Sequence, residues 1–216
     1  QQNVYIYRLN TIAFHLHGSG LKISSSIQSY PHMVQILNQQ NSIINRFIAE
    51  IRDAAIQKDR MRFRRNLERI GEIAAYEISR KMAYESKEVV TPLGIANVNV
   101  PKEEPVLATI LRAGLPLHQG LLNYFDHADN AFISAYRKHH KDGSFDISLE
   151  YVSSPSLHNR LVILSDPMLA TGGSGVQAVS FIKAAGAKKV VFVAVVSAPE
   201  GVEKMQKFHP DVDIFT

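Results

Sequence analysis

The sequence is 216 residues long, with 45% hydrophobic and 20% charged residues, a composition typical of a soluble globular protein with one sizeable core. The absence of cysteine excludes a disulfide framework, a thiolate metal site and a cysteine nucleophile. The formal net charge of +4 suits anionic small molecules and does not demand nucleic acid, and no apolar run reaches the roughly 18 residues of a membrane span.

Residues 1–32 form an N-terminal extension to which the sequence assigns no role. They mix aromatic and β-branched residues with a serine-rich tract, and they lack the charged region and cleavage site of a signal peptide. His15 and His17 could bind a metal if both faced one side of a strand, but such an isolated pair is a weak signal. We expect an extension or leader ahead of a single domain over residues 33–216.

Two helices are expected between residues 42 and 82. Ser42 is a candidate N-cap, and apolar residues recur at helical spacing over 43–51 and again over 67–78. Between these stretches lie arginines 60, 62, 64, 65 and 69, close to the acids Asp59, Glu68 and Glu72. The arginines could form a phosphate or RNA patch, but no aromatic residues are interleaved in the manner of single-stranded RNA binding. We favour a solvated helix face, with some arginines at a subunit contact.

The next stretches predict a hairpin arm and then the first buried strand. Thr91-Pro92-Leu93-Gly94 separates two β-like runs within residues 88–100. Residues 105–111 form a short apolar strand, and residues 115–125 are helical. Arg112 follows the strand directly, which is where open α/β sheets bind their ligands. The alternative is that Arg112 pairs with a local acid.

A second hairpin is expected from residue 130 to residue 152. The strand at 130–136 ends in Arg137 and Lys138, residues 139–144 form a polar turn, and residues 145–152 return as an alternating strand. The turn has charge, a glycine and no apolar anchor, as a mobile hairpin over an active site needs. His139 and His140 are adjacent and would point to opposite faces of a strand, so we expect solvent exposure rather than catalysis.

Residues 161–186 are the most informative stretch. Residues 161–165 read as a buried parallel strand, which ends sharply at Asp166 because a proline follows. Four small residues at 171–174 then open a helix that ends at Gly186. The free N–H groups at a helix start attract phosphate, and Thr171 and Ser174 add hydroxyl donors. Asp166 can accept hydrogen bonds from ribose hydroxyls, so the pattern suits a sugar phosphate.

The same residues allow three other interpretations of this loop. A Walker loop fails because no lysine follows the glycines. Gly173, Gly175 and Ala178 fit the loose dinucleotide pattern, but seven residues separate the strand from Gly173, where that fold places its first glycine almost at once. A plain βα connection is the third, although such loops seldom open with an acid and a proline.

The rest of the chain completes an α/β pattern. Residues 189–196 form a second apolar strand, residues 199–208 a helix, and residues 212–216 the start of another strand. The order from residue 105 is β-α-β-β-β-α-β-α-β. It predicts a mainly parallel twisted sheet with helices on both faces, preceded by the N-terminal helices and the hairpin arm.

The block DPMLATGGS, residues 166–174, resembles the phosphoribosyl-pyrophosphate signature of the uracil phosphoribosyltransferases. The similarity runs from about residue 41 to the last residue. It includes ATILRAGLPLHQGLL at 108–122, AYRK at 135–138 and SAPEGVEKMQKFHPDVDIFT at 197–216. Other type I phosphoribosyltransferases carry two adjacent acids where this block begins. Pro167 stands at the second place here, which is similar to the uracil branch.

The resemblance implies a type I phosphoribosyltransferase fold and a reaction of pyrimidine salvage, in which uracil and 5-phosphoribosyl 1-pyrophosphate give UMP and diphosphate. It implies that Arg112 and Arg137 contact the leaving pyrophosphate and that Asp166 holds the ribose hydroxyls, which makes these three the catalytic residues. The other implied donor-binding residues are Pro167, Met168, Leu169, Ala170, Thr171, Gly172, Gly173 and Ser174. Mg²⁺ is expected on the donor's own oxygens, because the sequence offers no obvious carboxylate cage. No general base is evident.

The resemblance also implies a cytoplasmic homodimer that binds small molecules, with no membrane partner and no expected nucleic-acid partner. The family continues past this last strand with a glycine-rich loop that reads the uracil edge, so the uracil-binding residues are expected beyond Thr216. Regulation by GTP cannot be read from the sequence. The rival hypothesis is a catalytically silent regulatory or RNA-binding protein that has kept the fold.

Overall fold

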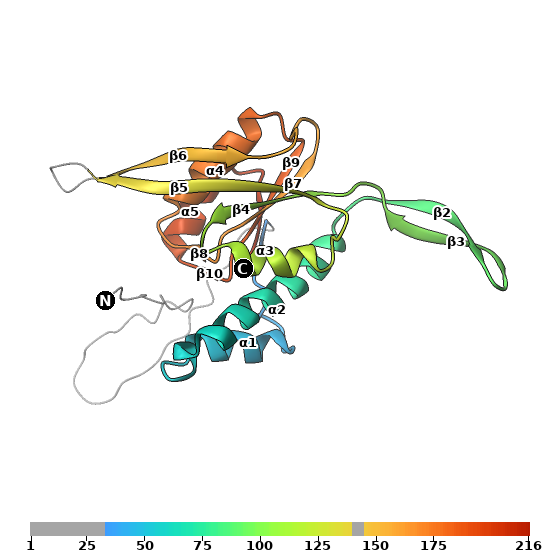
Figure 1. Ribbon diagram of the computed structural model, residues 1–216, viewed down its shortest axis with the longest axis horizontal. Helices are drawn as coiled ribbons and strands as arrows, with labels where there is room; N and C mark the ends of the chain where they lie inside the picture. The colour runs from blue at the N-terminus through green and yellow to red at the C-terminus, as the bar shows by residue number, and fades with distance from the viewer. Residues whose placement is uncertain (1–32, 140–144) are drawn as a thin grey trace.

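The computed structural model describes residues 33–139 and 145–216, with side chains for residues 33–135 and 152–216 (Figure 1). The predicted pair His15 and His17, and His140, lie outside these residues. The helical elements are α1 (Ile44–Arg52), η1 (Ile56–Lys58), α2 (Arg60–Ser79), α3 (Leu115–Leu122), α4 (Gly173–Ala184) and α5 (Pro199–Phe208). The strands of the main sheet are β1 (Val34–Gln35), β4 (Val106–Leu111), β5 (Asp129–His139), β6 (Phe145–Ser153), β7 (Leu161–Ser165), β9 (Lys189–Val193) and β11 (Asp213–Phe215).

The seven strands of this sheet lie in the order β1-β11-β9-β7-β4-β5-β6. All neighbours are parallel except β5 and β6, which form the antiparallel hairpin that projects from the body in Figure 1. From β4 the chain builds outward through β5 and β6, and then returns to the other side of β4 with β7, β9 and β11. The direction in which successive strands are added to the sheet therefore reverses between β4 and β7. Open α/β sheets bind their ligands at the carboxyl ends of the strands at such a reversal.

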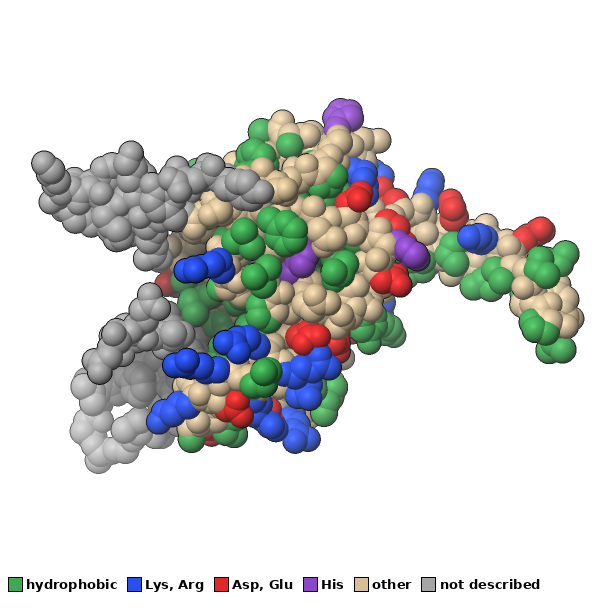
Figure 2. Space-filling model, viewed as in Figure 1, with side chains coloured by type: hydrophobic (Ala, Val, Ile, Leu, Met, Phe, Trp, Pro, Cys, Tyr) green, Lys and Arg blue, Asp and Glu red, His purple; other side chains and the backbone are tan. Residues whose placement is uncertain are grey.

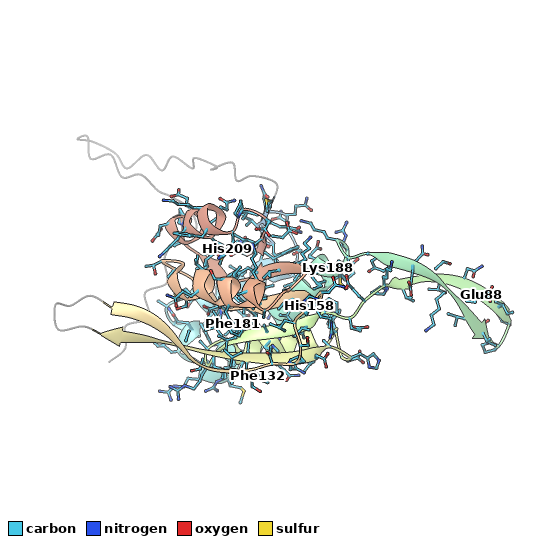
Figure 3. All side chains as sticks on the ribbon, turned by 90° about the horizontal axis from the view of Figure 1, so that it is seen from above. Glu88, Phe132, His158, Phe181, Lys188 and His209 are labelled. Atoms are coloured by element: carbon cyan, nitrogen blue, oxygen red, sulfur yellow. The ribbon has the colours of Figure 1, made fainter. Side chains whose placement is uncertain are left out.

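Helices cover both faces of the sheet, as the near-continuous apolar strands require. One core joins α1, α2 and α3 to alternate strand residues, including Leu107, Ile163 and Val191. The other joins α4 and α5 to the residues between them, including Leu164 and Phe192. Figure 3 shows α4 and α5 on their shared face, with Phe181 and His209 marking that layer. The predicted α/β fold with a mainly parallel sheet and two helical layers is confirmed.

The predicted arm is present as strands β2 (Tyr84–Thr91) and β3 (Gly94–Pro101), which pair antiparallel over their full length. It is longer than the sequence indicated and projects away from the domain (Figure 1), and Glu88 lies far from the body in Figure 3. Thr91 Oγ1 donates to Gly94 O at 2.8 Å across the turn, and Gly94 has a φ of 133°, which favours glycine. The arm forms a sheet of its own.

Several boundaries differ from the predictions. The N-cap of α1 is Ile43, not Ser42, and no side chain caps that helix. The second helix begins at Arg60, well before the apolar repeat at 67, because the Asp59 side chain accepts from the N–H groups of Met61 and Arg62. The apolar run after residue 189 is divided: β9 ends at Val193, and the short β10 (Val196–Ser197) pairs with β8 (Met168–Leu169) in a separate sheet. Strand β1 was not predicted at all.

Candidate active site

The carboxyl ends of β4 and β7 form the centre of the candidate site. Thr109 of β4 is the ladder partner of Ser165 of β7, so Arg112 and Asp166 leave the same edge of the sheet from neighbouring strands. Gly114 holds the turn after β4 against this edge. A Cβ on Gly114 would come within 2.7 Å of Ile110 O and 3.2 Å of Ser165 O. The two predicted loops are therefore neighbours, although 54 positions apart in the printed sequence.

The loop between β7 and α4, residues 166–172, is held by the chain that leaves β9. The N–H groups of Val195 and Val196 both donate to Pro167 O at 3.0 Å, and Ala198 N–H donates to Leu169 O at 2.8 Å. The first turn of α5 also touches the loop. A Cβ on Gly201 would overlap Ala170 O and would lie 2.6 Å from Leu169 O. The loop is therefore fixed by backbone contacts rather than by long side chains.

The start of α4 has the features of an anion site. Val176 N–H donates to Gly172 O at 2.9 Å, whereas the backbone N–H groups of residues 171–175 donate to no backbone carbonyl of the described residues. Gly172 at the N-cap has a φ of 74°, a conformation that suits glycine. Thr171 is exposed and Ser174 is half-buried, so both hydroxyls can reach a ligand. Unpaired amides at the positive end of a helix favour a phosphate here.

Asp166 opens the loop that leads to these amides and is half-buried. Burial raises the pKa of its carboxyl to about 7, although a hydrogen bond from Met168 N–H opposes the rise. Within the part of the chain that the structure describes, no basic side chain pairs with it. A buried carboxylate without an ionic partner costs free energy. Its hydrogen-bonding capacity is therefore available to a ligand.

The other predicted residues divide into three groups. Arg112 is exposed at the end of β4, follows a cis peptide bond, and pairs with no acid among the described side chains. Arg137 lies on β5, but its side chain is outside those that the structure describes, as are those of Lys138 and His139. Within the loop, Met168 is exposed, Pro167 and Ala170 are half-buried, and Leu169 is buried in the α4–α5 core. Leu169 can therefore offer a ligand only its backbone.

The sequence analysis missed the residues that hold the loops in place. The importance of Thr109, Ser165 and Gly201 comes from partners more than 30 positions away, and Ser165 and Gly201 carry no local signal of function. Gly114 was not singled out either. A sequence signal did exist in one case: Thr109 is a hydroxyl residue inside an otherwise apolar strand, VLATIL.

Two of the five arginines of α2, Arg62 and Arg65, are engaged by acids. Arg62 donates to Glu50 of α1 through Nε at 3.0 Å and through a terminal nitrogen at 3.1 Å, and Arg65 lies 2.6 Å from Glu68. Arg69 lies over the ring of Phe47, 5.2 Å from its centroid. Figure 2 shows basic and acidic side chains interspersed over α1 and α2. Glu50, which the sequence analysis did not single out, is the main partner, and this arrangement favours a solvated helix face over a nucleic-acid patch.

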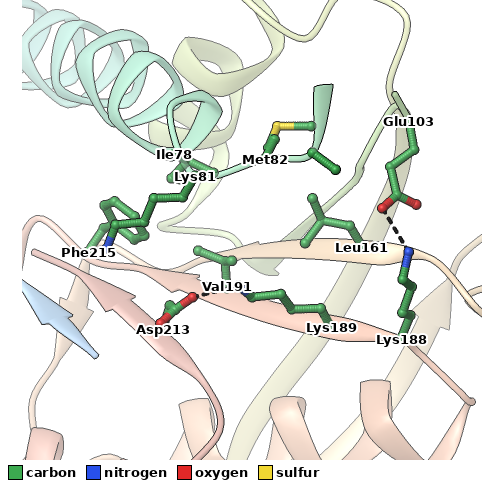
Figure 4. Close-up of a pocket in the computed structure, with 11 residues that line it drawn as sticks. Ile78, Lys81, Met82, Glu103, Leu161, Lys188, Lys189, Val191, Asp213 and Phe215 are labelled. Atoms are coloured by element: carbon green, nitrogen blue, oxygen red, sulfur yellow. Dashed lines mark hydrogen bonds and ion pairs between the residues drawn. The ribbon is translucent and has the colours of Figure 1, made fainter. Parts of the chain in front are cut away.

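A separate hollow of about 230 Å³ lies at the amino ends of β7, β9 and β11, below the end of α2 (Figure 4). Its floor is apolar, and its rim carries Lys188 paired with Glu103 at 3.1 Å and Lys189 paired with Asp213 at 2.8 Å. Lys81 rests over the Phe215 ring, 4.9 Å from its centroid. This hollow is at the opposite end of the strands from Asp166 and is not part of the candidate site.

Within residues 33–139 and 145–216, no group of three or more histidine or acidic side chains is placed to hold a metal ion. No helix there is both long enough and apolar enough to cross a bilayer.

Comparison with known proteins gives a consistent result. Residues 38–216 match the family model for uracil phosphoribosyltransferase. The uracil phosphoribosyltransferase of Porphyromonas gingivalis is 49% identical over 176 residues, which cover 81% of this chain and 82% of that protein. The one from Thermococcus kodakarensis is 35% identical over 181 residues, covering 82% and 77%. The solved structure of the AQ2163 protein from Aquifex aeolicus is 29% identical, with a TM-score of 0.72, and the match covers 84% and 85% of the two chains.

Proposed function

Because the chain belongs to the uracil phosphoribosyltransferase family, we propose that the β7–α4 loop and the turn after β4 together bind the phosphoribosyl donor of that reaction. The enzyme is a pentosyltransferase of pyrimidine salvage, which joins uracil to 5-phosphoribosyl 1-pyrophosphate and gives UMP and diphosphate. The single observation that carries the site assignment is the row of amides at residues 171–175 that have no backbone acceptor, at the end of the loop that Asp166 opens.

Each part of the site has a role that its chemistry supports. The amides at the start of α4, with the hydroxyls of Thr171 and Ser174, bind the 5′-phosphate. Asp166 accepts hydrogen bonds from the ribose hydroxyls. Arg112, which has no acid partner among the described side chains, binds the pyrophosphate, and Arg137 on β5 adds a second cation there. Pro167, Met168, Leu169 and Ala170 contribute through the backbone of the loop.

These residues support a mechanism in which the protein positions charge rather than forming a covalent intermediate. The bond between C1′ of the donor and the pyrophosphate oxygen breaks as positive charge builds on the ribose ring, and the uracil nitrogen forms the new bond to C1′ and releases its proton to water. Arg112 and Arg137 stabilise the negative charge that develops on the departing pyrophosphate, and Asp166 holds the ribose while this happens. No residue of the site is assigned as a general base.

Mg²⁺, a homodimer and a cytoplasmic location are further parts of the proposal. The ion would be held by oxygens of the donor and would screen the pyrophosphate charge. The projecting arm, with apolar side chains exposed at its tip, supports self-association. The absence of cysteine fits a reducing compartment.

Calorimetry with 5-phosphoribosyl 1-pyrophosphate and Mg²⁺ tests the site. Arg112→Gln removes a charge-assisted contact, which is worth about 1.5–3 kcal/mol, so donor affinity should fall by roughly ten- to hundredfold. Gly173→Val places a branched side chain at the phosphate site and should abolish measurable binding while the protein stays folded. Arg64→Gln, the same charge change at an exposed position of α2, should bind the donor like the parent protein. Unchanged affinity in the first two variants would refute the site assignment.

Incubation with labelled uracil, donor and Mg²⁺ separates the enzyme from its rival. UMP formation is the expected result. Donor binding without any UMP would instead favour a silent regulatory protein, for which the unpaired Arg60 and Arg64 on α2 are the remaining described support.

A further inference from the structure

A buried pair of hydroxyls lies below the two loops of the site. Thr109 and Ser165 have 0% exposed surface and are partners in the β4–β7 ladder. Thr109 Oγ1 donates to Ser165 O at 3.2 Å, and Ser165 Oγ donates to Ala108 O at 3.2 Å. These bonds link β4 to β7, the two strands between which the order of strand addition reverses. Ser165 is the residue directly before Asp166, so the hydrogen bond from Thr109 ends at the base of the β7–α4 loop.

Thr109 also supports the turn that carries Arg112. Gly114 approaches so closely that a Cβ there would overlap Thr109 Oγ1, and its own N–H donates to Ile110 O at 3.1 Å. The turn therefore packs directly against the Thr109 side chain. A single buried side chain thus contacts both the residue before Asp166 and the glycine two positions after Arg112.

The rest of the strand shows that a hydroxyl is unusual at this position. The neighbours of Thr109 in β4 are all apolar and buried or nearly so. Burying a hydroxyl is unfavourable unless it is hydrogen-bonded, and valine would fill the same volume with a higher preference for a strand. What valine could not supply is the bond to Ser165 O. The chemistry of the position thus points to the link between the strands rather than to packing.

We propose that Thr109 is a positioning residue for donor binding, which sets the separation of Arg112 and Asp166 without touching the donor. This inference rests on the proposed function, in which these two groups hold the pyrophosphate and the ribose of one donor molecule. A ligand that spans two loops is bound most tightly when the loops are already held at the right separation. The Thr109 hydroxyl fixes this separation, because it bonds to Ser165 O at the base of one loop and packs against Gly114 in the other.

Calorimetry of the full chain with donor and Mg²⁺ tests this role through a conservative rescue. Thr109→Val keeps the volume but leaves Ser165 O without its hydroxyl donor, and donor affinity should fall by about tenfold. Thr109→Ser keeps the hydroxyl, and its affinity should stay within about twofold of the parent protein. Ile182→Val, a small truncation of the buried α4 core, controls for a general loss of stability and should not change donor affinity. If Thr109→Val does not fold, Ser165→Ala removes the reciprocal bond and should weaken the donor several-fold.

The outcomes separate this inference from the proposed function. Normal affinity in Thr109→Val, together with weak binding in Arg112→Gln, would overturn the positioning role and leave the site assignment standing. Normal affinity in both variants would overturn both. Equal losses in Thr109→Val and Thr109→Ser, or a loss in Ile182→Val, would show that volume or stability controls the affinity, and would also overturn the positioning role.

Discussion

At the scale of single residues, Asp166 shows how a functional group can lower stability. Its carboxyl is half-buried, has no basic partner among the described side chains, and has a pKa of about 7 in the folded protein. The folded state therefore holds a proton between about pH 4 and pH 7, where the unfolded chain has already released it. Stability falls with rising pH wherever the folded state binds more protons, so this group lowers the stability across that window.

Replacing this carboxyl with an amide should therefore stabilise the fold and impair the site. Asp166→Asn removes the cost of charging, so its advantage over the parent protein should be small at pH 4, grow to pH 7, and then level off at up to about 4 kcal/mol. Urea unfolding at several pH values measures this difference. Donor affinity at pH 8 should fall in the same variant, because the amide replaces a charged acceptor for the ribose hydroxyls.

Asp211 provides a control of opposite sign. A hydrogen bond from Lys183 holds the pKa of its carboxyl below its usual value, so ionisation of Asp211 favours the fold at neutral pH. Asp211→Asn should not stabilise the protein at any pH above 4, and it should not affect donor binding. A stabilisation of Asp166→Asn that is the same at pH 4 and pH 8 would contradict the charge explanation.

At the scale of secondary-structure elements, α5 acts as a support for the β7–α4 loop. Gly201 in its first turn lies against the carbonyl oxygens of Leu169 and Ala170, and Gly172 lies in turn against the Gly201 backbone, with 3.0 Å between Gly201 O and a Cβ built on Gly172. Backbone contacts of this kind cannot relax by a change of rotamer. The position of the loop therefore depends on a helix that begins more than 25 positions later.

Gly201→Ala should displace the loop without adding any group to the site. The new Cβ would overlap two carbonyl oxygens, so either the loop or the first turn of α5 must shift by several tenths of an ångström. We expect donor affinity, measured by calorimetry, to fall by about tenfold or more, because small displacements of binding groups carry large penalties. The melting temperature should also decrease.

Gly186→Ala separates these two effects. Gly186 has a φ of 85° and lies close to His158 Nδ1, so alanine there is strained and destabilising. It lies past the far end of α4, which is about 18 Å long, and so is remote from the loop. Its donor affinity should stay normal. A normal affinity in Gly201→Ala would show that α5 does not set the loop position.

These elements also show what sequence alone can predict. The strand at 161–165, Asp166 and the glycine-opened helix α4 follow from local patterns, because strand length, a proline and small residues act over a few positions. Strand β1 was missed since two residues give no periodicity, and its pairing with β11 depends on the rest of the sheet. The α1–α2 contact was missed because Glu50 and Arg62 lie on different helices. In the site, the bond between Thr109 and Ser165 joins positions that only the sheet order brings together.

At the scale of the whole molecule, the arm exposes apolar side chains that a single subunit leaves unburied. Val90, Leu93 and Ile95 at its tip are 86%, 100% and 71% exposed, and Val90 and Ile95 are cross-strand partners. Figure 2 shows these apolar side chains gathered at the end of the projection. A two-stranded hairpin is only marginally stable alone, and clustered apolar groups favour burial. In a two-fold dimer each tip would pack on the other subunit, which supports the proposed homodimer.

Charges placed at this tip should therefore weaken self-association and leave the domain folded. The double variant Val90→Asp and Ile95→Asp adds two carboxylates to one face of the arm, and burying them in an interface would cost several kcal/mol. Sedimentation equilibrium should show a dimer for the parent protein at micromolar concentration and a larger monomer fraction for the variant. Thermal unfolding at low concentration should be nearly unchanged, because both positions are exposed in the single chain. Gln177→Asp, an exposed position on α4, adds charge away from the arm and should remain dimeric. A monomeric parent protein, or a double variant that dimerises as tightly as the parent, would show that the arm does not join two copies of this chain.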